Sequence, residues 1–149
     1  VYSANFSIGV TLLSSLVSNS TQMLGAEWDI EILEMHHKHK IDAPSGTALL
    51  LGKSAAEARG QDLSSVKSVS RKGIVGKRKE SEIGFAVLRG GDVVGEHSVI
   101  FSSSGERIEL VHKATDRSIF ASGALRASHW AATADPGLYS LSDVLINGG

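Results

Sequence analysis

Hydrophobic and polar residues alternate along four segments of the chain, while other segments carry apolar residues at helical spacing. Alternation with a period of two is typical of strands that bury one face, whereas a helix brings residues three and four apart onto one face. We therefore predict strands over 28–35, 81–88, 93–102 and 107–113, with a less regular candidate over 64–71. Helices are predicted over 8–24, 47–59, 116–134 and 141–145, with Asp116 as a cap. The mixture indicates an α+β fold.

The helix predicted over 47–59 begins directly after Pro44, which cannot continue a preceding helix or strand ladder. Ser45 is a good N-cap, and Gly46 and Thr47 then supply N–H groups that have no partner within the helix. The helix dipole adds roughly half a positive charge at this end, so a carboxylate or phosphate binds there readily. Taken alone, the same pattern also fits a plain helix start without a ligand.

Three histidines and two lysines lie within residues 36–40, at the end of the first predicted strand. Histidine titrates near neutral pH and serves as a general acid or base, while lysine attracts anions. One alternative is a metal site built on His36 and His39, which the absence of cysteine and of an evident completing carboxylate disfavours. Another is a solvated basic loop. A nucleic-acid surface is disfavoured because the net charge is −1 and aromatic residues make up only 5% of the chain.

Composition narrows the class of protein further. A chain of 149 residues with 42% hydrophobic content is long enough to form one domain with a real core. No apolar run is long enough for a transmembrane helix, and no signal-peptide pattern is present, so we expect no membrane partner. The absence of cysteine excludes disulfides and fits a reducing cytoplasm.

The roles of two further features, a pair of strand histidines and a basic segment, are also to be assigned. Strict alternation places His97 on one face with Val99 and Phe101, and it places His112 on a similar face of the next strand. A lone histidine on an apolar face is usually a hydrogen-bonded core or interface residue, and we expect that role for both. The basic segment 71–79 is predicted to be an exposed loop, with a flap over an anionic site as the alternative.

Several segments together resemble the dihydrodipicolinate reductase family of the bacterial lysine pathway. The strongest is His-His-Lys-His-Lys-Ile-Asp-Ala-Pro-Ser-Gly-Thr-Ala at 36–48, which is similar to the family signature. Further similar segments occur at 3–10, 83–86, 89–97, 105–110 and 112–114. Lys38 stands where arginine is frequent in the family, which weakens any bidentate role there.

The resemblance implies an oxidoreductase that reduces a small cyclic dicarboxylate to tetrahydrodipicolinate with NADPH or NADH, in lysine and diaminopimelate biosynthesis. It implies His36 as proton donor and acceptor and Lys40 as second proton donor. The substrate-binding positions it implies are His37, Ser45, Gly46 and Thr47, and the cofactor-binding positions are Ser3, Ala4, Asn5 and Phe6. It implies no metal, a cytoplasmic homotetramer, and a mixed sheet of about four or more strands with helices on one face.

No two glycines lie two positions apart, so the G-x-G-x-x-G fingerprint of dinucleotide binding is absent. The family carries that fingerprint in an N-terminal domain, and we therefore expect this chain to be a fragment of a longer enzyme. Its expected parts are a domain junction (1–8), a substrate-binding and oligomerisation domain (9–116) and a helical segment that packs on the nucleotide domain (117–149). By itself the chain is expected to bind a dicarboxylate and oligomerise without turnover.

Overall fold

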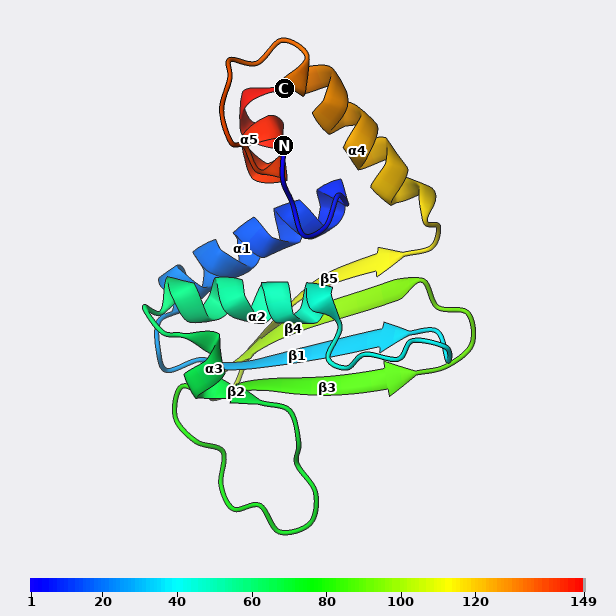
Figure 1. Ribbon diagram of the computed structural model, residues 1–149. Coiled ribbons are helices and arrows are strands. Elements are labelled where there is room, and N and C mark those ends of the chain that lie inside the picture. The colour runs from blue at the N-terminus through cyan, green and yellow to red at the C-terminus, as the bar shows by residue number, and fades with distance from the viewer. Residues whose placement is uncertain (149) are drawn as a thin grey trace.

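The computed structural model describes residues 1–148 and contains a five-stranded sheet with helices along one face (Figure 1). The helices are α1 (Ile8–Leu24), α2 (Gly46–Ala58), α3 (Leu63–Val66), α4 (Ser118–Ala131) and α5 (Leu141–Asn147). The strands are β1 (Asp29–His36), β2 (Lys67–Ser68), β3 (Ile83–Arg89), β4 (Gly95–Ser102) and β5 (Arg107–Ala114). Their order is β2-β3-β1-β4-β5, with β1 parallel to β3 and antiparallel to β4. The predicted α+β fold with a mixed sheet is confirmed.

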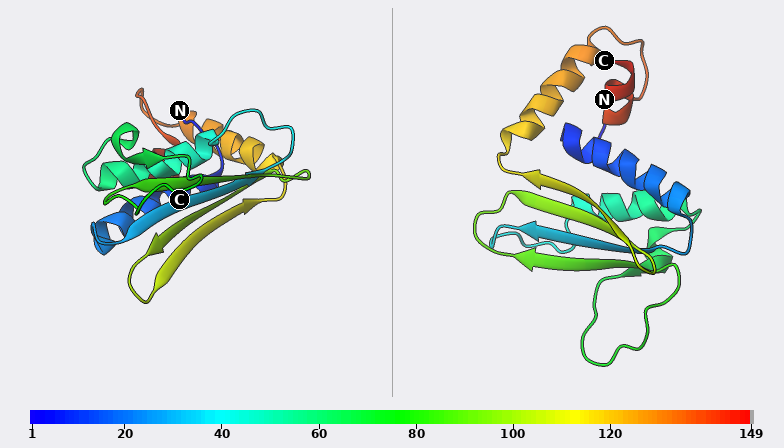
Figure 2. Two further views of the ribbon diagram at one scale, coloured as in Figure 1. Left: turned by 90° about the horizontal axis from the view of Figure 1, so that it is seen from below. Right: turned by 180° about the vertical axis from the view of Figure 1, so that it is seen from behind.

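The main core lies between the sheet and the pair of helices α1 and α2, which pack on each other (Figures 1 and 2). Strand β1 alternates as the sequence predicts, because every second residue from Ile30 to His36 is buried beneath these helices. The buried core residues are Leu13, Val17, Ile30, Ile32, Ala48, Leu51, Ala55, Ala56, Ile83, Phe85, Val99 and Phe101. Each large aliphatic side chain buried here contributes about 2 kcal/mol, so this cluster supplies the main stability of the sheet-facing layer.

Helix α2 begins as its sequence predicts. The Ser45 Oγ accepts a hydrogen bond from the Ala48 N–H at 3.1 Å, which satisfies one of the free donors of the first turn. At Gly52 a Cβ atom would lie 2.5 Å from the Phe85 ring, so the glycine lets the helix approach β3 closely. The Ser45 N–H donates to the Glu34 carboxylate at 2.9 Å, which holds the start of α2 over the carboxyl end of the central strand.

The sheet register brings distant residues to that end of β1. Strand β1 is central, and Glu34 lies opposite His97 of β4 while His36 lies opposite Arg89 of β3. Alternation then directs Glu34 and His36 to the helix-covered face. A carboxylate, two histidines and an arginine consequently meet beneath the N-terminus of α2.

Two local predictions were wrong. Residues 64–71 do not form one strand, because the Asp62 carboxylate accepts from the Ser64 N–H at 2.7 Å and starts the single-turn helix α3. Only the two residues of β2 then pair with β3. Asp116 is not the N-cap of α4, which begins after Arg117, although its carboxylate accepts from the Ser118 N–H at 2.6 Å.

The basic segment 71–79 lies in the long loop that projects from the sheet beside β2 (Figure 1). Two ion pairs hold the base of this loop against strand β1: Arg71 pairs with Glu31 at 2.7 Å, and Arg78 pairs with Asp29 at 2.8 Å. Gly84 makes room for this arrangement, since a Cβ there would lie 1.9 Å from the Glu31 carboxylate. The two arginines are engaged by acidic residues of the sheet, which favours the exposed loop over a flap that binds anions.

Helices α4 and α5 lie beyond the sheet, against the N-terminal segment (Figure 2). Their small separate core consists of Ala127, Leu141, Val144, Phe6 and Trp130. A reciprocal capping box between Ser140 and Asp143 starts α5. The close approach of α4 to the N-terminal segment depends on Gly123, where a Cβ would lie 1.7 Å from the Phe6 carbonyl oxygen.

Replacing Gly123 with alanine should therefore separate α4 from the N-terminal segment, because the added Cβ overlaps backbone that cannot rotate away. We expect the free energy of unfolding in urea to fall by about 1–3 kcal/mol. Gly46→Ala is the matched control, since no atom lies within 4 Å of its added Cβ, and it should change stability by less than about 1 kcal/mol. Equal stabilities of the two variants would show that this contact does not matter.

Candidate functional site

Glu34 is the centre of the buried polar cluster at the end of β1. Its side chain is only 1% exposed, and both carboxylate oxygens accept two hydrogen bonds. Arg89 donates to them from two nitrogens, at 2.8 and 3.0 Å. The Ser45 N–H donates to Oε1 at 2.9 Å, and the His36 ring approaches Oε2 through Nδ1 at 2.5 Å. The carboxylate is thus fully satisfied despite its burial.

These contacts determine the protonation state of Glu34. Burial is the largest single influence and would raise its pKa, but the bonds from Arg89, His36 and the Ser45 N–H together lower the pKa below its usual value. At neutral pH the group is therefore a carboxylate, which can only accept hydrogen bonds. We accordingly assign the shared proton to His36 Nδ1, which leaves Nε2 to exchange protons.

Gly95 provides the space beside that second nitrogen. A Cβ at this position would lie 3.0 Å from His36 Nε2, closer than most real side-chain contacts. The first residue of β4 therefore leaves the reactive edge of the ring free of a neighbouring side chain.

His97 lies on the other side of the cluster and bonds to the start of α2. Its Nε2 is 3.0 Å from the Ser45 Oγ, and its ring meets that of His36 edge to face, with centroids 5.1 Å apart. Burial first, and the neighbouring His36 second, lower the pKa of His97 to about 4. His97 is therefore neutral at physiological pH and acts as a hydrogen-bonding partner of Ser45, in line with the core role predicted for it.

The predicted cofactor positions Ala4 and Asn5 meet the predicted substrate positions Gly46 and Thr47 at the start of α2. The Thr47 Oγ1 accepts a hydrogen bond from the Asn5 side-chain amide at 3.0 Å, which joins the N-terminal segment to this helix. The Ser3 hydroxyl donates to the Asn5 carbonyl at 2.7 Å and shapes the same segment. Phe6 departs from the group, because its side chain packs in the second core beside Trp130.

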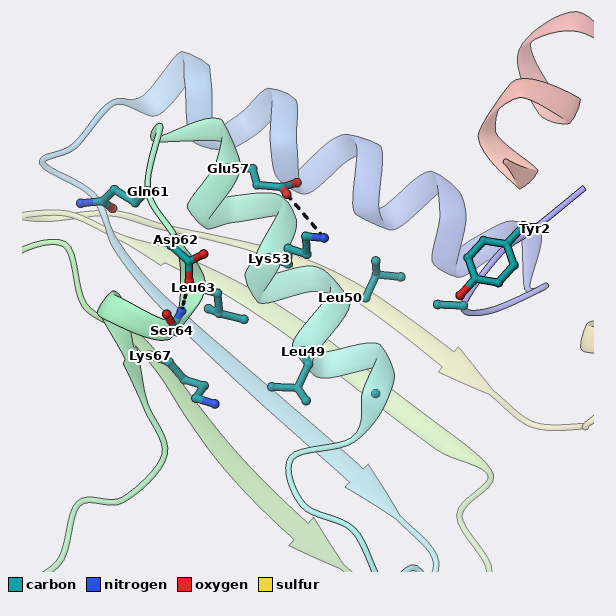
Figure 3. A pocket seen from close by; sticks show the side chains of 12 residues that line it. Tyr2, Leu49, Leu50, Lys53, Glu57, Gln61, Asp62, Leu63, Ser64 and Lys67 are labelled. Carbon is teal, nitrogen blue, oxygen red and sulfur yellow. Dashed lines mark hydrogen bonds and ion pairs between the residues drawn. The ribbon is translucent and has the colours of Figure 1, made fainter. Parts of the chain in front are cut away.

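Two cavities flank this region. One of about 620 Å³ runs along α2 and is lined by Tyr2, Ala4, Gly46, Leu49, Leu50, Lys53, Glu57, Gln61, Asp62, Leu63, Ser64 and Lys67 (Figure 3). The other, of about 590 Å³, is lined by His37, Lys38, His39, Gly91, Asp92 and Arg117. Neither is lined by His36 or Lys40. Of the predicted substrate residues, Gly46 lines the first cavity and His37 the second, whereas Ser45 and Thr47 line neither.

Lys40 lies in the loop between β1 and α2, where its ammonium bonds to the Asp42 carboxylate at 2.8 and 3.0 Å. That hydrogen bond lowers the pKa of Asp42. The loop is fastened further by the His37 N–H, which donates to the Val93 carbonyl at 2.7 Å, and by Arg89, which donates to the Asp42 carbonyl at 2.8 Å. Lys40 is therefore a cation paired with the exposed Asp42 carboxylate, and an anionic ligand can replace Asp42 as its partner.

Sequence reasoning missed Glu34, Arg89 and Gly95 as members of the cluster. Glu34 carried a usable signal, because it occupies a buried position in the alternation of β1 and a buried carboxylate needs partners. Arg89 and Gly95 carried none, since sheet register alone brings them to His36.

Within residues 1–148, no group of three or more histidine, cysteine, aspartate or glutamate side chains could hold a metal ion. The same part of the chain has no helix whose length and apolar content would suffice to cross a bilayer.

The fold and the cluster define an α+β domain that sets a carboxylate-bound histidine next to the N-terminus of a helix. The sequence profile described as "Dihydrodipicolinate reductase, C-terminus" matches residues 9–145, and the chain belongs to this family.

Individual relatives agree with that assignment. The chain is 57% identical over 145 residues to the 4-hydroxy-tetrahydrodipicolinate reductase of Parvibaculum lavamentivorans, covering 97% of this chain and 54% of the relative. It is 60% identical over 146 residues to that of Agrobacterium fabrum, covering 97% and 53%. The chain therefore spans about half the length of these relatives. A solved structure of a dipicolinate-bound dihydrodipicolinate reductase from Paenisporosarcina sp. TG-14 superposes with a TM-score of 0.72 at 25% identity, covering 95% of this chain and 52% of that one.

The lowered pKa of His97 predicts an acid-sensitive fold. The pKa of His97 is about 4 in the folded protein and about 6.5 in the unfolded chain. Between these values the unfolded chain binds one more proton, so the free energy of unfolding falls as the pH drops. This one group accounts for a loss of about 3 kcal/mol. Chemical denaturation at a series of pH values should show a flatter profile for His97→Gln than for the original chain. The exposed His129→Gln is the control and should keep the original slope; parallel profiles for all three proteins would refute the buried neutral state.

Proposed function

We propose that this chain is the substrate-binding half of a reductase that converts 4-hydroxy-tetrahydrodipicolinate to tetrahydrodipicolinate in bacterial lysine and diaminopimelate biosynthesis. The observation that carries the proposal is the Glu34 carboxylate, which holds both the His36 ring and the Ser45 N–H. A group that exchanges protons is thereby fixed beside a helix end that attracts carboxylates. Family membership supports this chemistry over that of a metal protein or a plain binding module.

Substrate binding is assigned to the start of α2 and the loop before it. The free N–H groups of Gly46 and Thr47 suit one carboxylate of a two-acid ring. Gly46 has no side chain to block the approach, and no atom lies within 4 Å of the position that a Cβ would occupy there. His37 and Lys40 complete the proposed set, and Ser45 contributes as the cap that orders the Gly46 and Thr47 amides, because its own N–H and hydroxyl are already bonded. The Paenisporosarcina reductase is described as dipicolinate-bound, and dipicolinate is a compound of this two-acid class.

The proton chemistry is assigned to His36 and Lys40. Loss of water from the 4-hydroxy ring gives the conjugated dihydrodipicolinate ring, and hydride addition to that ring leaves negative charge that a proton must quench. Nε2 of His36 is the nitrogen free for that exchange, because Glu34 holds Nδ1. Lys40 would leave Asp42 for a substrate carboxylate and stabilise the charge that develops during transfer, and it serves as the second proton donor.

NADPH or NADH is the proposed cofactor and supplies the hydride when bound. Most of its contacts are expected from a nucleotide-binding domain outside this chain. Within the chain, Ser3, Ala4, Asn5 and Phe6 are the proposed contacts near the reacting ring. The fit is best for Ala4 and Asn5, because Ala4 lines the cavity beside Gly46 and Asn5 bonds to Thr47.

A homotetramer formed through the open sheet face is part of the proposal. That face carries apolar side chains that no helix of residues 1–148 covers: Leu33, Met35, Leu88, Ile100 and Val111. A second copy with the same face would bury them. A cytoplasmic location is proposed because the cysteine-free chain fits a reducing compartment.

Substitutions in the full-length reductase test the two assigned roles. His36→Gln should lower kcat by about 10²–10⁴-fold, because it removes the proton-exchanging group while keeping a similar volume. Lys40→Ala should lower kcat and also raise KM, since it removes a substrate contact as well. Steady-state oxidation of NADPH measures both constants.

Lys79→Ala is the control, because Lys79 is exposed and belongs to the loop that contains residues 71–79, and it should leave kcat and KM unchanged. A reductase in which His36→Gln and Lys40→Ala both match the parent enzyme would exclude these role assignments.

A further inference from the structure

We propose that Glu34, held by Arg89, is a positioning residue that fixes the His36 ring and the first amides of α2 in one mutual arrangement. This inference rests on the proposed reductase function. Glu34 itself touches neither of the two cavities that flank the site, so its effect would pass through the groups that it binds.

Arg89 makes the buried carboxylate of Glu34 tolerable. A charge at 1% exposure is costly unless it is paired and hydrogen-bonded throughout. Arg89 supplies two parallel N–H bonds from the neighbouring strand, and the same guanidinium reaches the Asp42 carbonyl at 2.8 Å. The arginine therefore connects the carboxylate to the loop that carries Lys40.

The carboxylate also sets the orientation of the ring. Oε2 of Glu34 faces His36 Nδ1 at 2.5 Å, whereas Nε2 lies on the side where Gly95 has no side chain. A carboxylate that can only accept holds the neutral ring in the tautomer with its proton on Nδ1. Without Glu34 the neutral ring could carry its proton on either nitrogen and could rotate about its side-chain bonds.

The second oxygen of Glu34 links the ring to the substrate site. Oε1 accepts from the Ser45 N–H at 2.9 Å, and Ser45 caps the helix whose next two amides are those of Gly46 and Thr47. One rigid group thus sets the distance between the proton-exchanging nitrogen and the anion-binding helix end. Errors of about 1 Å in such a distance can cost about 100-fold in rate.

Strand β1 offers a matched control on its opposite face. Glu31 is also a glutamate bound by arginine side chains, those of Arg71 and Arg78, but it points away from the His36 side of the sheet. Glu31→Gln therefore removes the same chemistry from the same strand without touching the cluster.

A double-mutant cycle in the full-length reductase tests the proposal. Glu34→Gln should lower kcat by about 10–10⁴-fold, since removal of a carboxylate that orients a reactive histidine costs up to about 10⁴-fold. KM should change much less, because the amide oxygen of glutamine can still accept from Ser45. In a His36→Gln background, Glu34→Gln should cost kcat less than about twofold further, since its effect passes through the ring that is already absent.

An equal loss of kcat in both backgrounds would mean that Glu34 does not act through His36, and it would overturn the proposal, as would no loss in either. Glu31→Gln should leave kcat within about twofold of the parent enzyme. If Glu34→Gln does not fold, Arg89→Lys replaces it, because lysine keeps the charge but loses the paired bonds; the same non-additive pattern with His36→Gln is expected.

A spectroscopic reading on the 149-residue chain separates this inference from the proposed function. Nitrogen NMR spectra of the histidine rings, recorded where His36 is neutral, should show His36 protonated on Nδ1. The Glu34→Gln chain should show a mixture of both tautomers. If the parent reductase were inactive on its proposed substrate while this tautomer change appeared, only the proposed function would fail. Protonation of His36 on Nε2 in the original chain would overturn the positioning role directly.

Discussion

A single buried carboxylate holds the candidate site together. Glu34 lies beneath helix α2 and accepts bonds from the next strand, from a histidine ring and from the backbone of the helix cap. Burial opposes its charge, and these donors together outweigh that cost. The position of His36, the start of α2 and the loop that carries Lys40 are consequently not independent of one another, because each of them is bonded to Glu34 or to its partner Arg89.

The rest of the fold serves to bring those donors to one place. Strand β1 is the centre of the mixed sheet, so residues of β3 and β4 flank its carboxyl end from both sides. Gly52 lets α2 pack closely on the Phe85 ring of β3, and the bond from the Ser45 N–H to Glu34 holds the start of the helix at that end. The N-terminal segment then reaches the helix start through the bond from Asn5 to Thr47. Helices α4 and α5 lie away from this cluster, and they are fixed to the N-terminal segment through Phe6.

Sequence reasoning reached the parts of the site that local chemistry determines. The Ser45 cap, the helix start and the end of β1 at His36 follow from capping preferences and from alternation, and the structure has each within one residue of its predicted place. The contacts that organise the cluster lie beyond such reasoning, since Arg89 is 55 residues from Glu34 and His97 is 52 residues from Ser45. The register of the sheet determines which residues pair in this way, and a local sequence pattern does not reveal the register. The prediction over 64–71 failed for the opposite reason, because a local Asp62 cap outweighed a weak alternation.

The central claim is that a two-acid ring binds at the start of α2, next to His36. Titration of the isotopically labelled chain with pyridine-2,6-dicarboxylate, followed through its amide nitrogen–proton spectrum, tests that claim most directly. We expect saturable shifts concentrated at Gly46 and Thr47 and in the His36 ring, with no such response to pyridine itself. Shifts confined to other parts of the chain, or none up to millimolar ligand, would contradict it.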